Sequence, residues 1–432
     1  MPSDDTIAAV ATPAGRGGIG VVRVSGPGVG EVAKGVLGAL PAPRSAHHGT
    51  FRDARGEPID TGLALYFPAP HSYTGEDVVE FQGHGGPVVM QTLLSACIDA
   101  GARLAEPGEF TRRAFLNGKL DLAQAEAVAD LIDASSREAA RSALRSLSGE
   151  FSIAIHALQA KLVELRALTE AMLDFPEEDV ERLHRDDAAA RLASVRAAMD
   201  DVLAKSRQGS LLRSGVHVVL AGRTNVGKSS LLNRLAGTER AIVTPIPGTT
   251  RDALREPVQI AGVPLVLVDT AGLRVSSDVV EQLGIERTQR ELAQADVVLA
   301  VYDVTGDVAP LADLPAGAAR IDVFNKVDLA PAPPGALAVS AKSGAGMDEL
   351  RKAILAAVGW SATGETVFLA RERHLRALER AGGYLDAAAG ETRWELFAEE
   401  LRLAHLALGE ITGEVLADDL LGEIFARFCI GK

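Results

Sequence analysis

Residues 216–229 read Val-His-Val-Val-Leu-Ala-Gly-Arg-Thr-Asn-Val-Gly-Lys-Ser, a short apolar run followed by a glycine-rich turn. The run 230–235 then has a helical pattern. A strand, a Gly-x-x-x-x-Gly-Lys-Ser loop and a helix in this order are typical of a phosphate-binding P-loop. We expect Lys228 to reach the β- and γ-phosphates and take part in catalysis, and Ser229 to bind Mg²⁺. The predicted contacts of the loop are Asn225, Val226, Gly227, Lys228, Ser229 and Ser230.

A switch region is expected between the P-loop and the next strands. Asp269-Thr270-Ala271-Gly272 closes the apolar run 264–268, and it is expected to serve magnesium and the γ-phosphate. Thr250, in Gly248-Thr249-Thr250-Arg251-Asp252, is expected to bind Mg²⁺ and to act in hydrolysis. Leu273 stands where Ras-like switches place a glutamine that orients the attacking water. Another group must therefore do this, and the residues alone leave four candidates: Arg251, Arg274, Asp278 and Glu281.

Two later motifs indicate which base is bound. Asn325-Lys326-Val327-Asp328 follows the apolar run 321–324, and Ser340-Ala341-Lys342 follows the run 336–339. A carboxylate at Asp328 can accept hydrogen bonds from both N1–H and the N2 amino group of guanine, a donor pair that adenine lacks. The ordered set of motifs therefore predicts a GTP-binding and GTP-hydrolysing domain.

Composition limits the other possibilities. The chain has 432 residues and a formal net charge of −14, which argues against a broad basic surface that grips nucleic acid by itself. Cys97 and Cys429 are too few and too far apart for a disulfide framework, so we expect a reducing compartment. The N-terminus lacks a signal-peptide pattern, and no apolar run approaches the roughly 18 residues that span a bilayer. We expect a cytoplasmic protein with no membrane association.

The sequence texture divides the chain into four segments. Residues 1–118 carry Gly, Pro and short β-branched runs, which predict an α+β domain. Residues 119–207 and 366–432 have apolar residues at helical spacing, which predicts a helical bundle. Residues 208–365 alternate strands and helices and predict a mostly parallel sheet. The expected fold class is multidomain α/β plus all-α, with the GTPase domain inserted into the helical domain.

The whole chain resembles the MnmE (TrmE) family of tRNA-modification GTPases. The resemblance rests on the four-segment texture, on 248–252 and 269–274, and on the C-terminal Phe428-Cys429-Ile430-Gly431-Lys432. It implies folate-dependent addition of an aminomethyl or carboxymethylaminomethyl group at C5 of the wobble uridine of certain tRNAs. It also implies a homodimer formed through residues 1–118, and a flavoprotein partner, MnmG (GidA), in a heterotetramer. The implied cofactors are GTP, Mg²⁺, K⁺ and 5,10-methylenetetrahydrofolate, with 5-formyltetrahydrofolate as an analogue.

The same resemblance implies roles for particular residues. Glu281 is expected to help position the attacking water, so it is preferred over the other charged candidates. K⁺ would supply the positive charge that an arginine finger supplies elsewhere, and its expected ligands are Asn225, Thr244, Ile246 and Thr249. The expected folate contacts are Arg23, Glu80, Lys119 and the terminal Lys432. Cys429 is a candidate catalytic thiol, and a small buried apolar side chain is the alternative.

Two other functions remain open on sequence grounds. A ribosome-assembly GTPase that binds rRNA would carry similar nucleotide motifs, but it would be expected to have a basic RNA-binding appendage. A helical scaffold with an inactive nucleotide site would be expected to lack motif residues. Lys228, Ser229, Asp269 and Asp328 are all present, which disfavours the scaffold.

Overall fold

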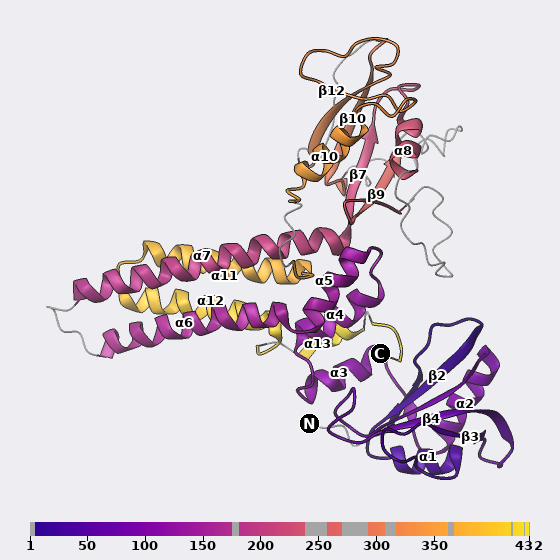
Figure 1. Cartoon of the computed structure of the whole chain (residues 1–432). Helices are drawn as coiled ribbons and strands as arrows, with labels where there is room; N and C mark the ends of the chain where they lie inside the picture. Colours follow the sequence, from indigo (N-terminus) through magenta and orange to yellow (C-terminus); the bar gives the residue numbers. More distant parts are fainter. Residues whose placement is uncertain are drawn as a thin grey trace, which may run out of the picture. The chain divides into compact units, whose positions relative to one another are not determined.

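The structure is a computed structural model that describes residues 5–174, 181–237, 257–269, 293–306, 317–361, 367–415, 418–426 and 428–431. The chain forms two compact units (Figure 1). Unit 1 contains residues 1–129 and 409–432, and unit 2 contains residues 130–408. Among the described helices, none combines the length and the apolar character needed to cross a membrane.

Unit 1 is built on a mixed six-stranded sheet. The order of strands is β3-β4-β5-β2-β1-β6, and all neighbours are antiparallel except β1 and β6. The strands are β1 (Ile7–Val10), β2 (Gly17–Ser25), β3 (His47–Arg52), β4 (Pro58–Phe67), β5 (Val78–Gly85) and β6 (Arg103–Leu104). Two helices connect them, α1 (Val29–Leu37) between β2 and β3 and α2 (Pro87–Asp99) between β5 and β6.

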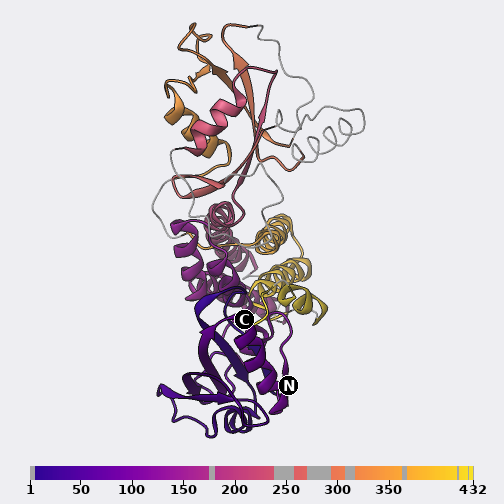
Figure 2. The same ribbon diagram turned by 90° about the vertical axis from the view of Figure 1, so that its right-hand side faces the viewer.

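One face of this sheet forms the core of unit 1. Alternating residues of the central strands, such as Val22 and Val24 in β2 and Phe81 in β5, are fully buried. They pack with the apolar sides of both α1 and α2, so the two helices cover the same face (Figures 1 and 2). Because side chains alternate along a strand, Arg23 and Glu80 lie on the opposite face. The alternation of side chains along each strand therefore places the core residues on one face of the sheet and the predicted folate residues on the other.

The rest of unit 1 consists of helices and the C-terminal segment of the protein. A small apolar cluster contains Leu122, Phe425 and Phe428. It joins α3 (Glu109–Leu116), α4 (Leu122–Ile132) and α13 (Asp418–Phe425). The C-terminal segment follows, and a side chain at Gly431 would meet the backbone of Val10 and Ala11. The C-terminal motif therefore lies against the end of β1.

Long helices form the first part of unit 2. They are α5 (Arg137–Leu147), α6 (Glu150–Asp174), α7 (Glu181–Ser214), α11 (Glu372–Gly390) and α12 (Trp394–Thr412). Four of them, α6, α7, α11 and α12, run side by side in Figure 1, and Figure 2 looks nearly along them. The glycine- and proline-free stretch 119–148 is not one helix. It breaks before Ser136, whose hydroxyl caps α5 by accepting a 3.0 Å hydrogen bond from Ala139 N–H.

The second part of unit 2 is an α/β sheet. Its strands are β7 (Val216–Ala221), β8 (Pro257–Ile260), β9 (Val263–Asp269), β10 (Val297–Asp303), β11 (Ala319–Asn325) and β12 (Leu337–Ala338). Their order is β12-β11-β10-β7-β9-β8, and only β8 is antiparallel to its neighbour. Two helices, α8 (Lys228–Ala236) and α10 (Met347–Ala357), belong to this part. The predicted fold class, multidomain α/β plus all-α, is confirmed.

Candidate nucleotide-binding site

The nucleotide motifs meet at one edge of the unit 2 sheet. Parallel strands β7, β10 and β11 end at Ala221, Asp303 and Asn325, and β9 ends at Asp269. The P-loop follows β7 directly, Asp269 ends β9 and Asn325 ends β11. Ligands of open α/β sheets bind outside the carboxyl ends of the strands. The topology therefore brings together motifs that are about a hundred residues apart in the sequence.

The P-loop has a backbone that its residue types permit. Asn225 and Gly227 have positive φ angles of 66° and 95°, and asparagine and glycine tolerate this conformation best. Gly227 precedes α8, and a Cβ atom at this position would lie 2.3 Å from Nδ2 of Asn325. Any larger residue would push the base loop away from the P-loop. Gly227 is therefore required for close approach as well as for its φ angle.

Lys228 is held inside this loop. Its side chain is buried, and Nζ donates 2.8 Å hydrogen bonds to the carbonyl oxygens of Gly222 and Arg223. The next residues of α8, Ser229 and Ser230, are exposed at the first turn of the helix. The ammonium group and two hydroxyls are thus at the helix N-terminus, where an anion is favoured.

Asn325 connects the P-loop to the base-binding loops. Its Nδ2 donates to the carbonyl of Val226 at 2.9 Å, and its Oδ1 accepts from Ala341 N–H at 3.0 Å. The side chain is buried, so both bonds are protected from water. One asparagine therefore holds the three predicted motifs in a fixed arrangement.

Asp328 presents an ionised carboxylate at the surface. The hydroxyl of buried Ser340 donates to its Oδ1 at 2.6 Å. This hydrogen bond is the main cause that lowers the pKa of Asp328, and the positive charges of Lys342 and Lys326 act in the same direction. A carboxylate held ionised can accept hydrogen bonds from guanine. Ser340 thus contacts Asp328 directly, and Lys342 lies close enough for its charge to act on the carboxylate.

Asp303 was not singled out from the sequence. It is the last residue of β10, and its Oδ2 lies 2.5 Å from Nζ of Lys326. The available signal was an acidic residue that ends an otherwise apolar strand beside the base-binding motif. The structure therefore adds one charged side chain to the candidate site.

Several predicted residues lie outside the described part of the chain. They are Thr244, Ile246, Thr249, Thr250, Thr270, Ala271, Gly272, Glu281 and Lys432. For Asp269 only the backbone is described, and it pairs with Leu220 of β7. The roles proposed for these residues stay predictions.

In unit 1, two predicted folate residues form an ion pair. Arg23 Nε lies 2.8 Å from Oε1 of Glu80, and both side chains are half-buried. The guanidinium carbon of Arg23 lies 5.3 Å from the ring centroid of Tyr73 and 5.8 Å from that of Phe110. Strand pairing explains the contact, because residues 23 and 80 are directly opposite in β2 and β5. A charged pair bordered by aromatic rings is a suitable surface for a flat polar heterocycle.

Lys119 and Cys429 are the other described candidates for folate binding and catalysis in unit 1. Lys119 is exposed, and its Nζ donates to the carbonyl of Pro70 at 3.1 Å. Cys429 is exposed, so it is not the small buried apolar residue that was the alternative. Its carbonyl accepts from Gly108 N–H at 3.4 Å. Cys97, in contrast, is buried, and burial raises its thiol pKa to about 12.

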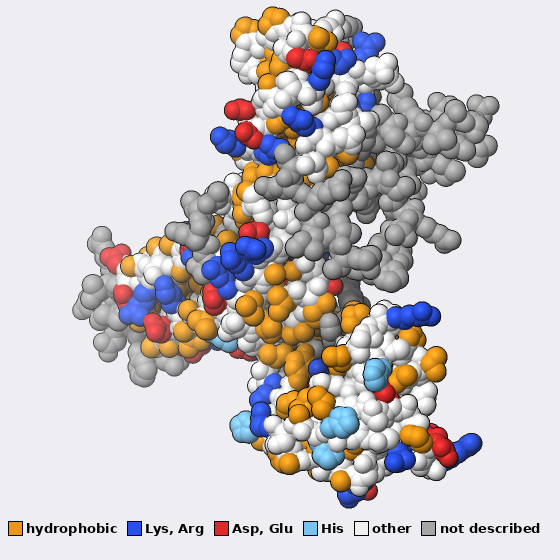
Figure 3. Space-filling view, turned by 45° about the vertical axis from the view of Figure 1, so that its right-hand side comes forward, with side chains coloured by type: hydrophobic (Ala, Val, Ile, Leu, Met, Phe, Trp, Pro, Cys, Tyr) orange, Lys and Arg blue, Asp and Glu red, His pale blue; other side chains and the backbone are white. Residues whose placement is uncertain are grey.

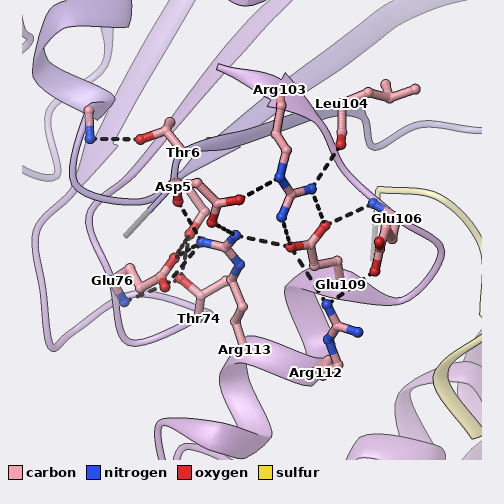
Figure 4. Close-up of polar contacts among 12 residues, drawn as sticks. Asp5, Thr6, Thr74, Glu76, Arg103, Leu104, Glu106, Glu109, Arg112 and Arg113 are labelled. Atoms are coloured by element: carbon pink, nitrogen blue, oxygen red, sulfur yellow. Dashed lines mark hydrogen bonds and ion pairs between the residues drawn. The ribbon is translucent and has the colours of Figure 1, made fainter. Parts of the chain in front are cut away.

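An ion-pair cluster holds the loop that carries Tyr73. Figure 4 shows Arg103 and Arg113 between the carboxylates of Asp5, Glu76 and Glu109. Tyr73 itself hydrogen-bonds to Thr111 of α3 through its hydroxyl, at 2.8 Å. The cluster therefore fixes the loop against α3 and keeps the Tyr73 ring beside Arg23.

Comparison with known proteins gives matches along the whole chain. The family model for the GTP-binding protein TrmE N-terminus matches residues 6–119. The family model for the MnmE helical domain matches residues 122–429. Together these two matches cover nearly all the described residues of both units.

Curated relatives and solved structures were also found. The tRNA modification GTPase MnmE of Azoarcus sp. (strain BH72) is 61% identical over 443 residues, which is 99% of this chain and 98% of the relative. The protein of the same name from Thiobacillus denitrificans is 59% identical over 441 residues, covering 100% of this chain and 99% of the relative. A crystal structure of Aquifex aeolicus Era has 26% identity and a TM-score of 0.27, and covers 41% of this chain and 69% of its own. Since the two family models and the full-length relatives agree, this chain belongs to the MnmE (TrmE) family of tRNA modification GTPases.

Proposed function

We propose that this protein hydrolyses GTP and uses the reaction in folate-dependent modification at C5 of the wobble uridine of certain tRNAs. The observation that carries the proposal is the set of contacts made by Asn325, which joins the P-loop to the loops beside Asp328. A guanine-reading carboxylate and a phosphate-binding loop are thus parts of one rigid site. The name tRNA modification GTPase, given to relatives of 61% and 59% identity, supports the assignment of the wider reaction.

Lys228 and Ser229 have different proposed roles at the phosphates of GTP. When GTP binds, the ammonium group of Lys228 leaves the carbonyl oxygens of Gly222 and Arg223 and donates to the phosphate oxygens instead. Its charge there stabilises the transition state of GTP hydrolysis. The exposed hydroxyl of Ser229 suits Mg²⁺, which prefers oxygen ligands, and Thr250 is to add a second hydroxyl. When bound, Mg²⁺ neutralises charge on the phosphate oxygens.

Potassium is proposed as a second cation of this site. Asn225 supports it, since this residue is exposed in the P-loop with a backbone that glycine and asparagine favour. Thr244, Ile246 and Thr249 are the other proposed ligands, and Glu281 is proposed to position the attacking water. These assignments rest on family resemblance.

Folate binding is proposed for unit 1. The Arg23–Glu80 pair supports it, because a carboxylate can accept from the N–H donors of a pterin ring and the adjacent, partly exposed Tyr73 ring can contact one of its faces. Lys119 and Lys432 are proposed to meet the negatively charged tail of 5,10-methylenetetrahydrofolate. Exposed Cys429 is proposed as a reactive thiol near this chemistry.

The proposal includes an assembly. The protein acts as a cytoplasmic homodimer joined through residues 1–118, and it forms a heterotetramer with the flavoprotein MnmG (GidA) that receives tRNA. The segments 1–118, 119–207, 208–365 and 366–432 are its proposed domains. In the alternative, a ribosome-assembly GTPase that binds rRNA, a basic surface would be expected. Acidic and basic side chains are instead mixed over the helices of unit 2 in Figure 3, which disfavours the alternative.

The test is complementation of cells that lack the gene for this protein. Mass spectrometry of tRNA nucleosides should show loss of the modified wobble uridine, restored by the intact chain. Lys228→Ala should fail to restore it, because the phosphate-binding charge is lost. Unchanged wobble nucleosides in the deletion strain, with altered ribosomal subunit profiles, would instead favour the rRNA alternative.

A further inference from the structure

Asp303, the last residue of β10, has polar partners at both of its carboxylate oxygens. Its Oδ1 accepts two hydrogen bonds, from Thr305 N–H at 2.9 Å and from the Thr305 hydroxyl at 2.7 Å. Its Oδ2 faces Nζ of Lys326 at 2.5 Å, and the Asp303 side chain is only 18% exposed. Burial acts to raise the pKa of Asp303, but the hydrogen bonds from Lys326 and Thr305 outweigh it and lower the pKa to about 2. The carboxylate is thus ionised and fixed in one orientation.

Lys326 uses the same ammonium group to reach the P-loop. Nζ donates a 2.9 Å hydrogen bond to the backbone carbonyl of Asn225, which is 101 residues away in sequence. Lys326 also has a positive φ angle of 70°, an uncommon backbone conformation for lysine. Such a conformation persists only where surrounding contacts over-determine it. The side-chain contacts with Asp303 and Asn225 act together with the backbone hydrogen bond from Leu329 N–H to the Lys326 carbonyl.

The consequence is a continuous chain of polar contacts from β10 to the P-loop. The ammonium group of Lys326 donates to Asp303 and also to the carbonyl of Asn225. Asn325 donates separately to the carbonyl of the next residue, Val226. Without a carboxylate at 303, the lysine side chain regains several rotamers, and the Asn225 carbonyl loses a charged donor. Of these polar contacts, those of Asn325 then remain to hold the P-loop beside the base loop.

We propose that Asp303 is a positioning residue for guanine-nucleotide binding, which acts by fixing Lys326 as a bridge between the base-reading loop and the P-loop at Asn225. Asp303 lies outside the four nucleotide motifs. The inference rests on the proposed GTP-binding function and extends it to a residue with no assigned role.

Asp303→Asn separates the positioning role from a structural one. Asparagine keeps an oxygen that can accept both bonds from Thr305, but it removes the charge that holds Lys326. We expect release of a fluorescent GDP analogue from the full-length protein to become about tenfold faster, which corresponds to about 1.4 kcal/mol. The KM for GTP should rise in parallel, kcat at saturating GTP should stay within about twofold, and the melting temperature without nucleotide should be unchanged.

The chain offers a matched control on the neighbouring strand. Asp322 of β11 pairs with Arg320 at 2.8 Å, but both side chains are exposed and neither is in the chain of contacts to the P-loop. Asp322→Asn should leave GDP release unaltered, and Asp303→Glu should restore part of the wild-type rate. Wild-type GDP release in Asp303→Asn, or a loss of melting temperature without nucleotide that accounts for the faster release, would overturn the proposal. Failure of the wild-type protein to bind guanine nucleotides would refute the proposed function instead.

Discussion

Glu109 of α3 illustrates how a single buried charge is stabilised. It is almost completely buried, yet it accepts hydrogen bonds from Arg103 at 2.6 and 2.8 Å, from Arg113 at 3.0 Å and from Glu106 N–H at 2.8 Å (Figure 4). Burial acts to raise its pKa, and the hydrogen bonds from Arg103, Glu106 and Arg113 outweigh it, so the pKa falls to about 2. Four donors therefore favour the ionised form over the neutral one.

This lowered pKa predicts how stability depends on pH. Because the pKa of Glu109 is lower in the folded than in the unfolded chain, its stabilising contribution is complete above about pH 4.5 and disappears as the pH falls toward 2. Glu109→Gln should lose about 3 kcal/mol of folding free energy at pH 7 and show a flatter acid dependence. Urea denaturation at several pH values measures both. Glu31, in an exposed pair with Lys34, is the control, and Glu31→Gln should leave the curve unaltered.

At the scale of elements, a single carboxylate connects three segments of unit 2 that are distant in sequence. Asp130, near the end of α4, accepts from Arg213 Nε at 2.9 Å and from Arg371 Nη2 at 2.8 Å. Arg213 belongs to the last turn of α7, just before β7, and Arg371 precedes α11. The chain enters and leaves the α/β sheet region through these two segments. The buried Asp130 therefore holds both connections at one point.

The second stability prediction concerns this contact. Asp130→Ala leaves two guanidinium groups without their shared carboxylate, in a place where water only partly replaces it. We expect a loss of about 3 kcal/mol, measured by urea denaturation followed by circular dichroism. The exposed pair of Arg196 on α7 and Asp386 on α11 provides a matched comparison, and Asp386→Ala should have little effect. Equal effects of the two substitutions would show that Asp130 is an ordinary surface ion pair.

At the scale of the whole molecule, the sheet of unit 1 has one open face. Leu63 is exposed and Leu65 of the same strand is half-buried, on the face that neither α1 nor α2 covers. Half-buried Val21 of β2 lies on this face too, on the far side of Gln82 of β5. Apolar side chains at the surface of a domain mark interaction sites when they are contiguous. This face is therefore the surface of residues 1–118 that we expect to form the proposed homodimer.

We expect the wild-type protein to be a dimer and a substitution on this face to convert it to the monomer. Analytical ultracentrifugation of the intact protein should give twice the mass of the chain. Leu63→Asp should shift the distribution toward the monomer, because a charge would be buried in the interface without a partner. Gln91→Asp on α2, at an exposed polar site on the other side of the sheet, tests whether any added charge has this effect. A wild-type protein that sediments as a monomer would contradict the proposed dimer.

Local sequence patterns were enough to predict the P-loop and the fold class of this protein. The P-loop could be predicted because strand, turn and helix are contiguous, and because glycine at 227 and lysine at 228 have roles that neighbours in the sequence define. The fold class followed from hydrophobic periodicity, which depends on the same short range. The residue pattern does not locate the break before Ser136, because a serine cap competes with helix continuation and leaves no change in periodicity.

Only the tertiary structure decided which distant charges meet. Asp303 and Lys326 are 23 residues apart, and Asp130 and Arg371 are 241 residues apart, so no periodicity links them. Their contacts arise because parallel strands end at one edge of the sheet and because the chain leaves the α/β region close to where it entered. The sequence alone therefore determined the nucleotide motifs and the fold class of this chain. The tertiary structure decided which side chains position those motifs, since an ion pair depends on distance in space and not on separation along the chain.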